Sequence, residues 1–310
     1  MNEKQEDSTM KKAICLILVA LLALSTLGLP ALAGDQGELG RLTKLNVDED
    51  TLTQAIMESY FDKVPFSRYR FFDNLNSMIG ALVSGSIAGM ALDEFTAEYL
   101  LSRAEEYAIY NPPETTPSYN LNFSMLLREE DAELRDRISE AIDAMKADGT
   151  LDALKKQYID EVIAGSEPEA IVPEVFEGGE TLKVAVTGDR PPMDYFSNAG
   201  EPIGFNTALV SEIGRRLGMN VEFVSIDTAA RALTLESGIS DVIFWMEAGD
   251  FGNWENADVE DQPAGTVVST PFLTGAFTIV VLASSEIMKS DEGYSAISEY
   301  DDTQEGGNSK

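Results

Sequence analysis

The sequence predicts an α/β protein in which two similar lobes face each other across a cleft. Apolar, β-rich runs alternate with amphipathic segments along the 310-residue chain, and this alternation is typical of parallel sheets covered by helices. The stretches "NSMIGALVSGSIAGMALD" and "TAARALTLESGISDVIFW" share one pattern, a helix followed by Ser-Gly and then a strand. Binding sites in such folds lie at the C-terminal edges of the strands. Two units of this kind therefore predict two lobes with a binding site between them.

The first 33 residues have the composition of a signal peptide. "MKK", which starts at Met10, provides a basic region, an apolar stretch follows it, and "ALA" before Gly34 fits a cleavage site. Cleavage would remove Cys15, the single cysteine, so the mature chain would have no thiol for a disulfide, a metal or catalysis. We expect an exported protein, extracellular or periplasmic, that is retained at the cell surface if the segment is not cleaved.

The region before residue 120 alternates strands and helices. We expect a brief strand around Leu42, a helix capped by Asp48 or Asp50, and a strand at "YRFFDN". A helix should follow and end at Ser84-Gly85, and Asp93 is the expected N-cap of the helix "DEFTAEYLLSRAEEY" after the buried strand "SIAGMAL". The residues expected on the inner face of the first of these helices are Leu75, Met78, Ile79, Leu82 and Val83.

The rest of the chain restarts the pattern after a linker. "YNLNFSMLL" predicts a strand, and two helices follow it, the second capped by Thr150. "GSEPEAIVPEVFEGGE" is a Pro/Glu/Gly linker by composition. From Thr181 the elements are the strand "LKVAVTG", a helix ending at Gly218, the strand "NVEFVSI", the helix "TAARALTLESG" and the strands "ISDVIFW" and "TGAFTIVVL".

The charge of the chain limits its partners. Asp and Glu number 54 against 22 Lys and Arg, histidine is absent, and the formal net charge is −32. A field of this sign repels nucleic acid and anionic membrane surfaces, so we expect neither as a partner. A highly solvated secreted surface accounts for the charge, and the alternative is that part of it attracts a cationic ligand.

Several motifs resemble the family 3 extracellular solute-binding proteins, which have the type II periplasmic binding fold. The turn and helix "VTGDRPPMDYFSNAGEPIGFNTALVSEIGRRLG", then "VEFVSIDTAARALTLESGISDVIFW" and the hinge strand "STPFLTGAFTIVV", match the opening of the family pattern. "MIGALVSGSIAGMALDEFTAEYLL" and "NFSMLLREEDAELRDRISEAIDAMKADGTLDALKKQYI" match its later portion. In this chain, the segment that resembles the C-terminal part of the family pattern therefore precedes the segment that resembles its N-terminal part.

Two arrangements explain this order. The chain is either a circular permutation, with each element present once, or a fragment of a tandem array; the inventory of elements favours permutation, which is tolerated where chain ends are close and exposed. The resulting segments are 1–33 signal peptide, 34–120 lobe 2, 121–165 return hinge strand and C-terminal-type helices packing on lobe 1, 166–180 linker, 181–265 lobe 1, 266–283 second hinge strand and 284–310 acidic tail.

The resemblance implies ligand contacts from both lobes. Tyr195 or Phe196 matches the family's aromatic that packs on the ligand, and Asp93 matches the acid that commonly meets a ligand ammonium; a core aromatic and a plain N-cap are the alternatives. Asp189 and Arg190 flank the same turn as the aromatics. Further candidates are Phe72, Trp245 and Glu247.

One departure from the family puts α-amino-acid binding in doubt. Amino-acid-binding members usually have "T-x-x-R" after the strand, and its Arg holds the ligand carboxylate, whereas here "MEAGDFGNWENADVEDQPAG" contains no Arg or Lys. Trp245 beside Glu247 and Asp250 would suit a cationic or amine ligand, unless these acids form only a surface loop. Arg190 is then the obvious substitute for a carboxylate anchor.

The sequence as a whole predicts a receptor. We expect a monomer that captures a small polar solute, amino-acid-like, amine or cationic, and delivers it to the permease of an ABC-type importer, with no cofactor and no metal. A degenerate, ligand-free or sensory domain is the alternative. An enzyme of the dehydratase type known on this fold is a remote one, because no spaced pair of acids stands out for acid–base catalysis.

Overall fold

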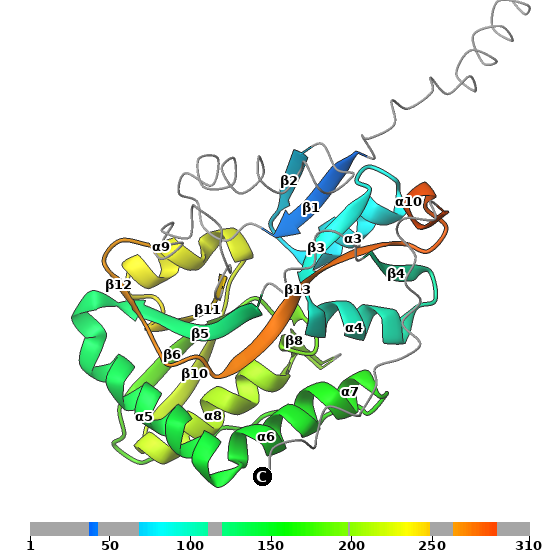
Figure 1. Cartoon of the computed structure of the whole chain (residues 1–310). Coiled ribbons are helices and arrows are strands. Elements are labelled where there is room, and N and C mark those ends of the chain that lie inside the picture. The colour runs from blue at the N-terminus through cyan, green and yellow to red at the C-terminus, as the bar shows by residue number, and fades with distance from the viewer. Residues whose placement is uncertain (1–36, 43–67, 111–119, 198, 249–262, 290–310) are drawn as a thin grey trace, which may run out of the picture. The chain divides into compact units, whose positions relative to one another are not determined.

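The computed structural model describes residues 37–42, 68–110, 120–197, 199–248 and 263–289 (Figure 1). The expected signal peptide, the helix after Asp48, the loop at 111–119 and the acidic tail beyond 289 lie outside these residues, as does Asp250. In the part described, none of the helices is long and apolar enough to span a membrane.

Strands and helices alternate through the described chain. The strands are β1 (Glu38–Leu42), β2 (Arg68–Phe72), β3 (Gly89–Asp93), β4 (Tyr107–Tyr110), β5 (Asn120–Arg128), β6 (Thr181–Val186), β7 (Asp189–Arg190), β8 (Asp194–Phe196), β9 (Pro202–Ile203), β10 (Asn220–Ser225), β11 (Val242–Ala248), β12 (Thr266–Val268) and β13 (Leu273–Leu282). The α-helices are α3 (Leu75–Val83), α4 (Glu94–Arg103), α5 (Ala132–Asp148), α6 (Thr150–Lys155), α7 (Glu161–Ile163), α8 (Phe205–Leu217), α9 (Arg231–Glu236) and α10 (Glu286–Lys289).

A ten-stranded mixed sheet runs through both lobes in the order β10-β6-β11-β5-β13-β3-β1-β2, with β12 paired to β5 and β4 paired to β13. Parallel pairs within lobe 1 (β10 with β6, β6 with β11) and within lobe 2 (β2 with β1, β1 with β3) fit the expected α/β units. A small three-stranded sheet, β7-β8-β9, carries the turn of lobe 1 that the sequence singled out.

Strand β13 joins the two lobes. Its first residues, Leu273 to Ala276, pair with β5, whereas Phe277 and the residues after it pair with β3 and β4 of lobe 2. The orange strand in Figure 1 can be followed from β5 to β3. The two expected hinge strands, β5 and β13, pair with each other where the lobes meet, and β5 also pairs with β11 of lobe 1.

Each face of the lobe 1 sheet is covered. The larger core contains residues of α5, α6 and α8, among them Ile142, Leu151 and Leu209, packed against Val184 and Phe123 of the sheet. On the other face of this sheet, Trp245 and Ile243 of β11 pack with Leu126 of β5 and with Leu235 of α9. In lobe 2, the residues Leu75, Met78 and Leu82 of α3 are buried as predicted, but Val83 is 56% exposed, so its assignment to the inner face was wrong.

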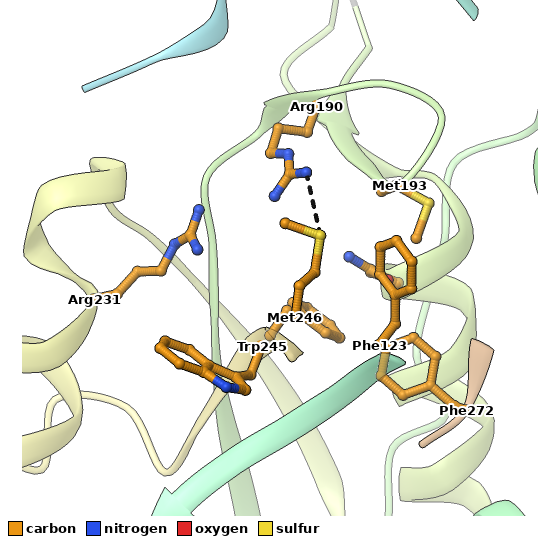
Figure 2. A pocket seen from close by; sticks show the side chains of 9 residues that line it. Phe123, Arg190, Met193, Arg231, Trp245, Met246 and Phe272 are labelled. Atoms are coloured by element: carbon orange, nitrogen blue, oxygen red, sulfur yellow. Dashed lines mark hydrogen bonds between the residues drawn. The ribbon is translucent and has the colours of Figure 1, made fainter. Parts of the chain in front are cut away.

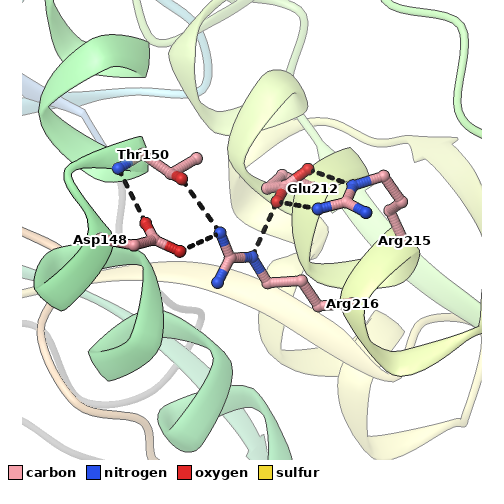
Figure 3. A network of polar contacts seen from close by, with 5 residues as sticks. All are labelled: Asp148, Thr150, Glu212, Arg215 and Arg216. Carbon is pink, nitrogen blue, oxygen red and sulfur yellow. Dashed lines mark hydrogen bonds and ion pairs between the residues drawn. The ribbon is translucent and has the colours of Figure 1, made fainter.

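Helices α5 and α6 are fastened to α8 by a polar network (Figure 3). Arg216 of α8 donates through Nη2 to Asp148 Oδ2 at 2.8 Å and to Thr150 Oγ1 at 3.0 Å, and Glu212 accepts from Arg216 Nε at 2.7 Å. Hydrogen bonds from the Thr150 hydroxyl and amide, together with Arg216, lower the pKa of Asp148 to about 2. Helices α5 and α6 thus pack on lobe 1, although lobe 2 precedes them in the chain, whereas the Val162 carbonyl of α7 accepts a hydrogen bond from Arg103 of α4 in lobe 2.

Some element boundaries differ from the expectation. Helix α4 ends at Arg103; of the four residues after it that were expected to be helical, the first three connect the two elements through a turn and Tyr107 begins β4. Thr150 does not cap α6: the N-cap is Gly149 in a left-handed conformation, and the Thr150 amide donates to Asp148 Oδ1 instead. The linker is tied to lobe 1, since Asn220 bonds to both Phe176 and Gly179.

Candidate functional site

The turn "GDRPPMDYF" is held by the carboxylate of Asp194. Its Oδ1 accepts hydrogen bonds from the amide and hydroxyl of Thr187, both at 3.0 Å, and from the Gly188 amide at 3.1 Å. Its Oδ2 accepts from Asn206 Nδ2 at 3.1 Å. This buried acid fixes β7 and β8 on the first turn of α8, a role that sequence reasoning did not assign to it.

Asp189 and Arg190 extend from this turn to lobe 2. The amide of Leu75, the first residue of α3, donates to Asp189 Oδ2 at 2.7 Å, so the carboxylate lies at the positive end of that helix. Arg190 Nη2 donates to Asp93 Oδ2 at 2.6 Å, and the two side chains are 10% and 0% exposed. The predicted lobe 1 residues therefore contact lobe 2 directly.

Asp93 is the N-cap of α4, as the sequence predicted. Its Oδ1 accepts from the Thr96 amide and its Oδ2 from the Thr96 hydroxyl, each at 2.9 Å. The ion pair with Arg190 adds a second donor to Oδ2, so Asp93 is fully engaged by groups of the protein. In this conformation Asp93 and Arg190 satisfy each other, so neither is left to meet a ligand ammonium or carboxylate alone.

The aromatic candidates of the turn lie beside the same interface. The Tyr195 ring is 6.4 Å from the ring of Tyr99 on α4, measured between centroids. Burial raises the pKa of Tyr195 from its ordinary 10.0 to about 12; Tyr99 adds to the rise and Arg103 opposes it. Phe196 packs on Gly188, where a Cβ would collide with its ring, and this position needs glycine also because its φ is +71°.

A small cavity lies in lobe 1 beneath Arg190 (Figure 2). Its volume is about 20 Å³, which is room for one or two water molecules. The lining residues are Phe123, Arg190, Met193, Asn206, Arg231, Phe244, Trp245, Met246 and Phe272. In the conformation described, therefore, an amino-acid-sized solute enters only if the surrounding side chains or the lobes move.

Arg231 is the residue of this cavity that sequence reasoning missed. It is the first residue of α9 and only 8% exposed. Within the described residues its guanidinium has neither a hydrogen bond nor an ion pair, and Figure 2 shows it directed towards Arg190 across the cavity. Burial lowers the pKa of Arg231 to about 10; Arg190 lowers it further, while Asp194 and Asp189 act in the opposite direction. The sequence feature that could have indicated Arg231 is that it is the one basic residue in the run "TAARALTLESG".

The remaining candidates are not gathered at one point. Trp245 is 2% exposed, belongs to the core and also lines the cavity, and its contact with a ligand stays a prediction. Phe72 lies on β2 with the guanidinium of Arg70 5.3 Å from its ring centroid, and it does not line the cavity. Glu247 lies in β11 opposite Asn122, and the position of its side chain is outside what the structure describes.

The described residues contain no group of three or more acidic, histidine or cysteine side chains that could hold a metal ion.

Comparison with known proteins gives a family for part of the chain. The described residues form an α/β fold of two lobes, in which two adjacent strands join the lobes. Residues 182–247, about a fifth of the chain, match the sequence model of the bacterial extracellular solute-binding proteins, family 3. The expected resemblance is therefore confirmed over this segment. No curated protein sequence matches the chain significantly.

Solved structures resemble the chain at low identity. The ligand-binding component of an ABC-type import system from Staphylococcus aureus, with zinc bound, is 10% identical, with 83% of this chain and 68% of that chain covered and a TM-score of 0.40. The GluR0 ligand-binding core from Nostoc punctiforme, in complex with L-glutamate, is 9% identical, with coverages of 82% and 87% and a TM-score of 0.35. A LysR family transcriptional regulator is 10% identical, with coverages of 81% and 65% and a TM-score of 0.36.

Proposed function

We propose that the protein is an exported receptor that binds a small polar solute between its lobes and delivers it to an ABC-type importer. The observation that carries this proposal is the position of the family match. Residues 182–247 supply Arg190, Asn206, Arg231 and Trp245, so most of the cavity lining comes from the segment with a solute-binding sequence. A turn of that segment also reaches lobe 2, which is the arrangement a cleft between two lobes needs.

The proposed organisation is a circular permutation within one monomeric chain. Lobe 2 comprises 34–120 and lobe 1 comprises 181–265 together with the helices of 121–165, joined through the linker at 166–180. The pairing of β13 with both β5 and β3 supports this organisation, because one strand then serves both lobes of a single unit. The packing of α5 and α6 on α8 supports it as well.

We propose that the protein itself is exported and that the solute it binds is imported. Residues 1–33 act as the signal peptide, and the solute passes to the permease of an ABC-type importer. Amino-acid-like, amine and cationic solutes are the ligand classes that the sequence raises. The chain is proposed to be a binding protein and not an enzyme, since the matched family consists of solute-binding proteins.

A second candidate is a ligand-free or sensory domain. The specific observation that favours it is the ion pair between Asp93 and Arg190, which fastens the lobes together without a solute. In such a protein the cavity would hold only water, and the two lobes would act as one rigid body.

A thermal-shift screen decides between the two candidates. The protein is first unfolded and refolded so that any solute retained from the cell is removed. It is then heated with amino acids, amines, polyamines, small peptides and organic acids, each at saturating concentration. A receptor gains stability by mass action, about 2.7 kcal/mol when the solute is at one hundred times its Kd. If no compound raises the Tm, the receptor is excluded in favour of the ligand-free domain.

A further inference from the structure

Arg231 brings a charge into lobe 1 that the described part of the protein does not neutralise by contact. The side chain is more than nine-tenths buried and lines the cavity, and none of the described residues accepts a hydrogen bond from it. A buried charge without a partner is costly, because the guanidinium loses water and gains nothing in return. Such a residue is stabilised when a ligand supplies the missing negative charge.

We propose that the cavity binds the carboxylate of a small monocarboxylate that lacks an amino group, and that Arg231 is the residue that holds it. This inference rests on the proposed function, since it assigns the class of solute to the same site. It departs from the amine and cationic solutes that the acidic composition raised.

The charges around the cavity favour one negative group. Of the lining residues, Arg190 and Arg231 are charged, and Arg190 is already paired with Asp93. Asp189 and Asp194 lie near enough to influence Arg231, but neither lines the cavity, and both accept hydrogen bonds from backbone amides. Arg231 is therefore the charged lining residue without a direct partner among the described residues, although the fields of Asp189 and Asp194 offset part of its charge. A single carboxylate in the cavity would give it that direct partner.

The unused polar atoms of the lining include a donor for a carboxylate and also one acceptor, Asn206 Oδ1, which is buried without a donor. Arg190 Nε is buried without a hydrogen-bond acceptor, so it is a second donor beside the Arg231 guanidinium. Figure 2 shows the two arginines facing each other from opposite elements, β7 and α9. The lining includes no carboxylate that could pair with an ammonium, and Asp93 is occupied by Thr96 and Arg190.

The walls of the cavity favour a ligand whose part beyond the carboxylate is apolar. Phe123, Phe244 and Phe272 surround the polar end, and Met193 and Met246 complete the lining. Methionine side chains are unbranched and repack easily, so they can make room beyond the present 20 Å³. A planar carboxylate on a short aliphatic or aromatic body satisfies both the arginine and these walls.

The test compares matched acids and amines on refolded protein. The probes are propionate and benzoate, the amines propylamine and benzylamine, and the amino acids alanine and phenylalanine, all at constant ionic strength. We expect propionate or benzoate to raise the Tm, and neither the amines nor the amino acids to do so. An amine or an amino acid that raises the Tm more than its matched acid overturns the inference and leaves the receptor function intact. No shift with any compound overturns both.

Variants of Arg231 assign the effect to this residue. Arg231→Met should abolish the shift, and without ligand it should be at least as stable as the parent, because it removes an unpaired buried charge. Arg215→Met, at an exposed arginine of α8, is the control and should keep the full shift. Arg231→Lys, which keeps the charge and loses the planar fork, should weaken binding by about tenfold. Unchanged affinity in both Arg231 variants overturns the inference.

Discussion

At the scale of single residues, the ion pair of Asp93 and Arg190 is a buried contact between the lobes. The sequence assigned one residue to each side of a ligand, whereas the structure joins them at 2.6 Å. A buried pair of this kind is weak as a source of net stability, but loss of one partner is expensive because the other charge remains buried. A substitution that removes the charge of either side chain should therefore weaken the contact between the lobes.

Substitution of Asp93 by asparagine should expose this dependence. Asparagine can still cap α4 through the Thr96 amide, but it leaves Arg190 without a countercharge. We expect a loss of about 3–5 kcal/mol in the free energy of unfolding, measured by urea denaturation, and partial recovery in the double variant with Arg190→Met. Asp160→Asn, which breaks the half-exposed pair with Lys155, should cost less than about 1 kcal/mol. Equal effects of the two asparagine variants would show that the buried pair contributes no more than the exposed one.

Tyr195 provides a pH test of the same interface. Its pKa is raised to about 12 in the folded state and is 10.0 ordinarily, so the folded protein holds this proton more tightly. The associated stability is complete below pH 10 and is lost as the pH rises towards 12. Urea denaturation between these values should show a steeper loss for the parent protein than for Tyr195→Phe. If the free energy of unfolding fell equally with pH in both proteins, the Tyr195 hydroxyl would be as accessible to solvent in the folded chain as in the unfolded one.

Residue roles that depend on local sequence could be predicted, and those that depend on distant neighbours could not. The cap at Asp93 follows from an acid at the start of a helical run, and the structure has it. Arg231 was overlooked because periodicity treats an arginine in an amphipathic helix as a surface residue, and its burial depends on a cavity formed by other strands. The pairing of Asp93 with Arg190 spans 97 positions, and no spacing rule reports it.

At the scale of elements, β5 and β13 decide how the lobes are joined. Both were expected as strands from their sequence pattern and as hinge strands from the family resemblance, and they pair with each other where the lobes meet. The sequence did not show that β13 changes partners between Ala276 and Phe277, because register is set by the neighbouring strands. It also did not indicate β4, which is short and follows a helix without a strong stop signal.

The close approach of helix α4 to β13 can be tested at Gly275. A Cβ at this position would lie 2.7 Å from Phe95 Cε2 and 3.0 Å from Glu94 Oε1, so Gly275→Ala should destabilise the protein by about 1–3 kcal/mol. Gly80→Ala is the matched control: it has open space in helix α3 and should stabilise by about 0.5–1 kcal/mol. Urea denaturation measures both, and a neutral Gly275→Ala would mean that α4 does not pack on the hinge strand.

At the scale of the whole molecule, the order of the elements and the net charge both favour a monomeric binding unit. The proposed permutation places the two lobes and both hinge strands in one chain, so one chain should form one complete binding unit. A net charge of −32 keeps such chains apart through mutual repulsion, which favours a monomer. The same charge slows the approach of an anionic solute at low salt, so added salt should speed binding of a carboxylate and slow binding of an amine.

The binding stoichiometry can be measured by isothermal titration calorimetry on refolded protein whose mass in solution is known from sedimentation. We expect a monomer that binds one solute molecule per chain, with propionate or benzoate as the titrant. One solute per two chains would show that the halves of the chain belong to different binding units, and the absence of heat with every class of solute would show that the protein is not a receptor.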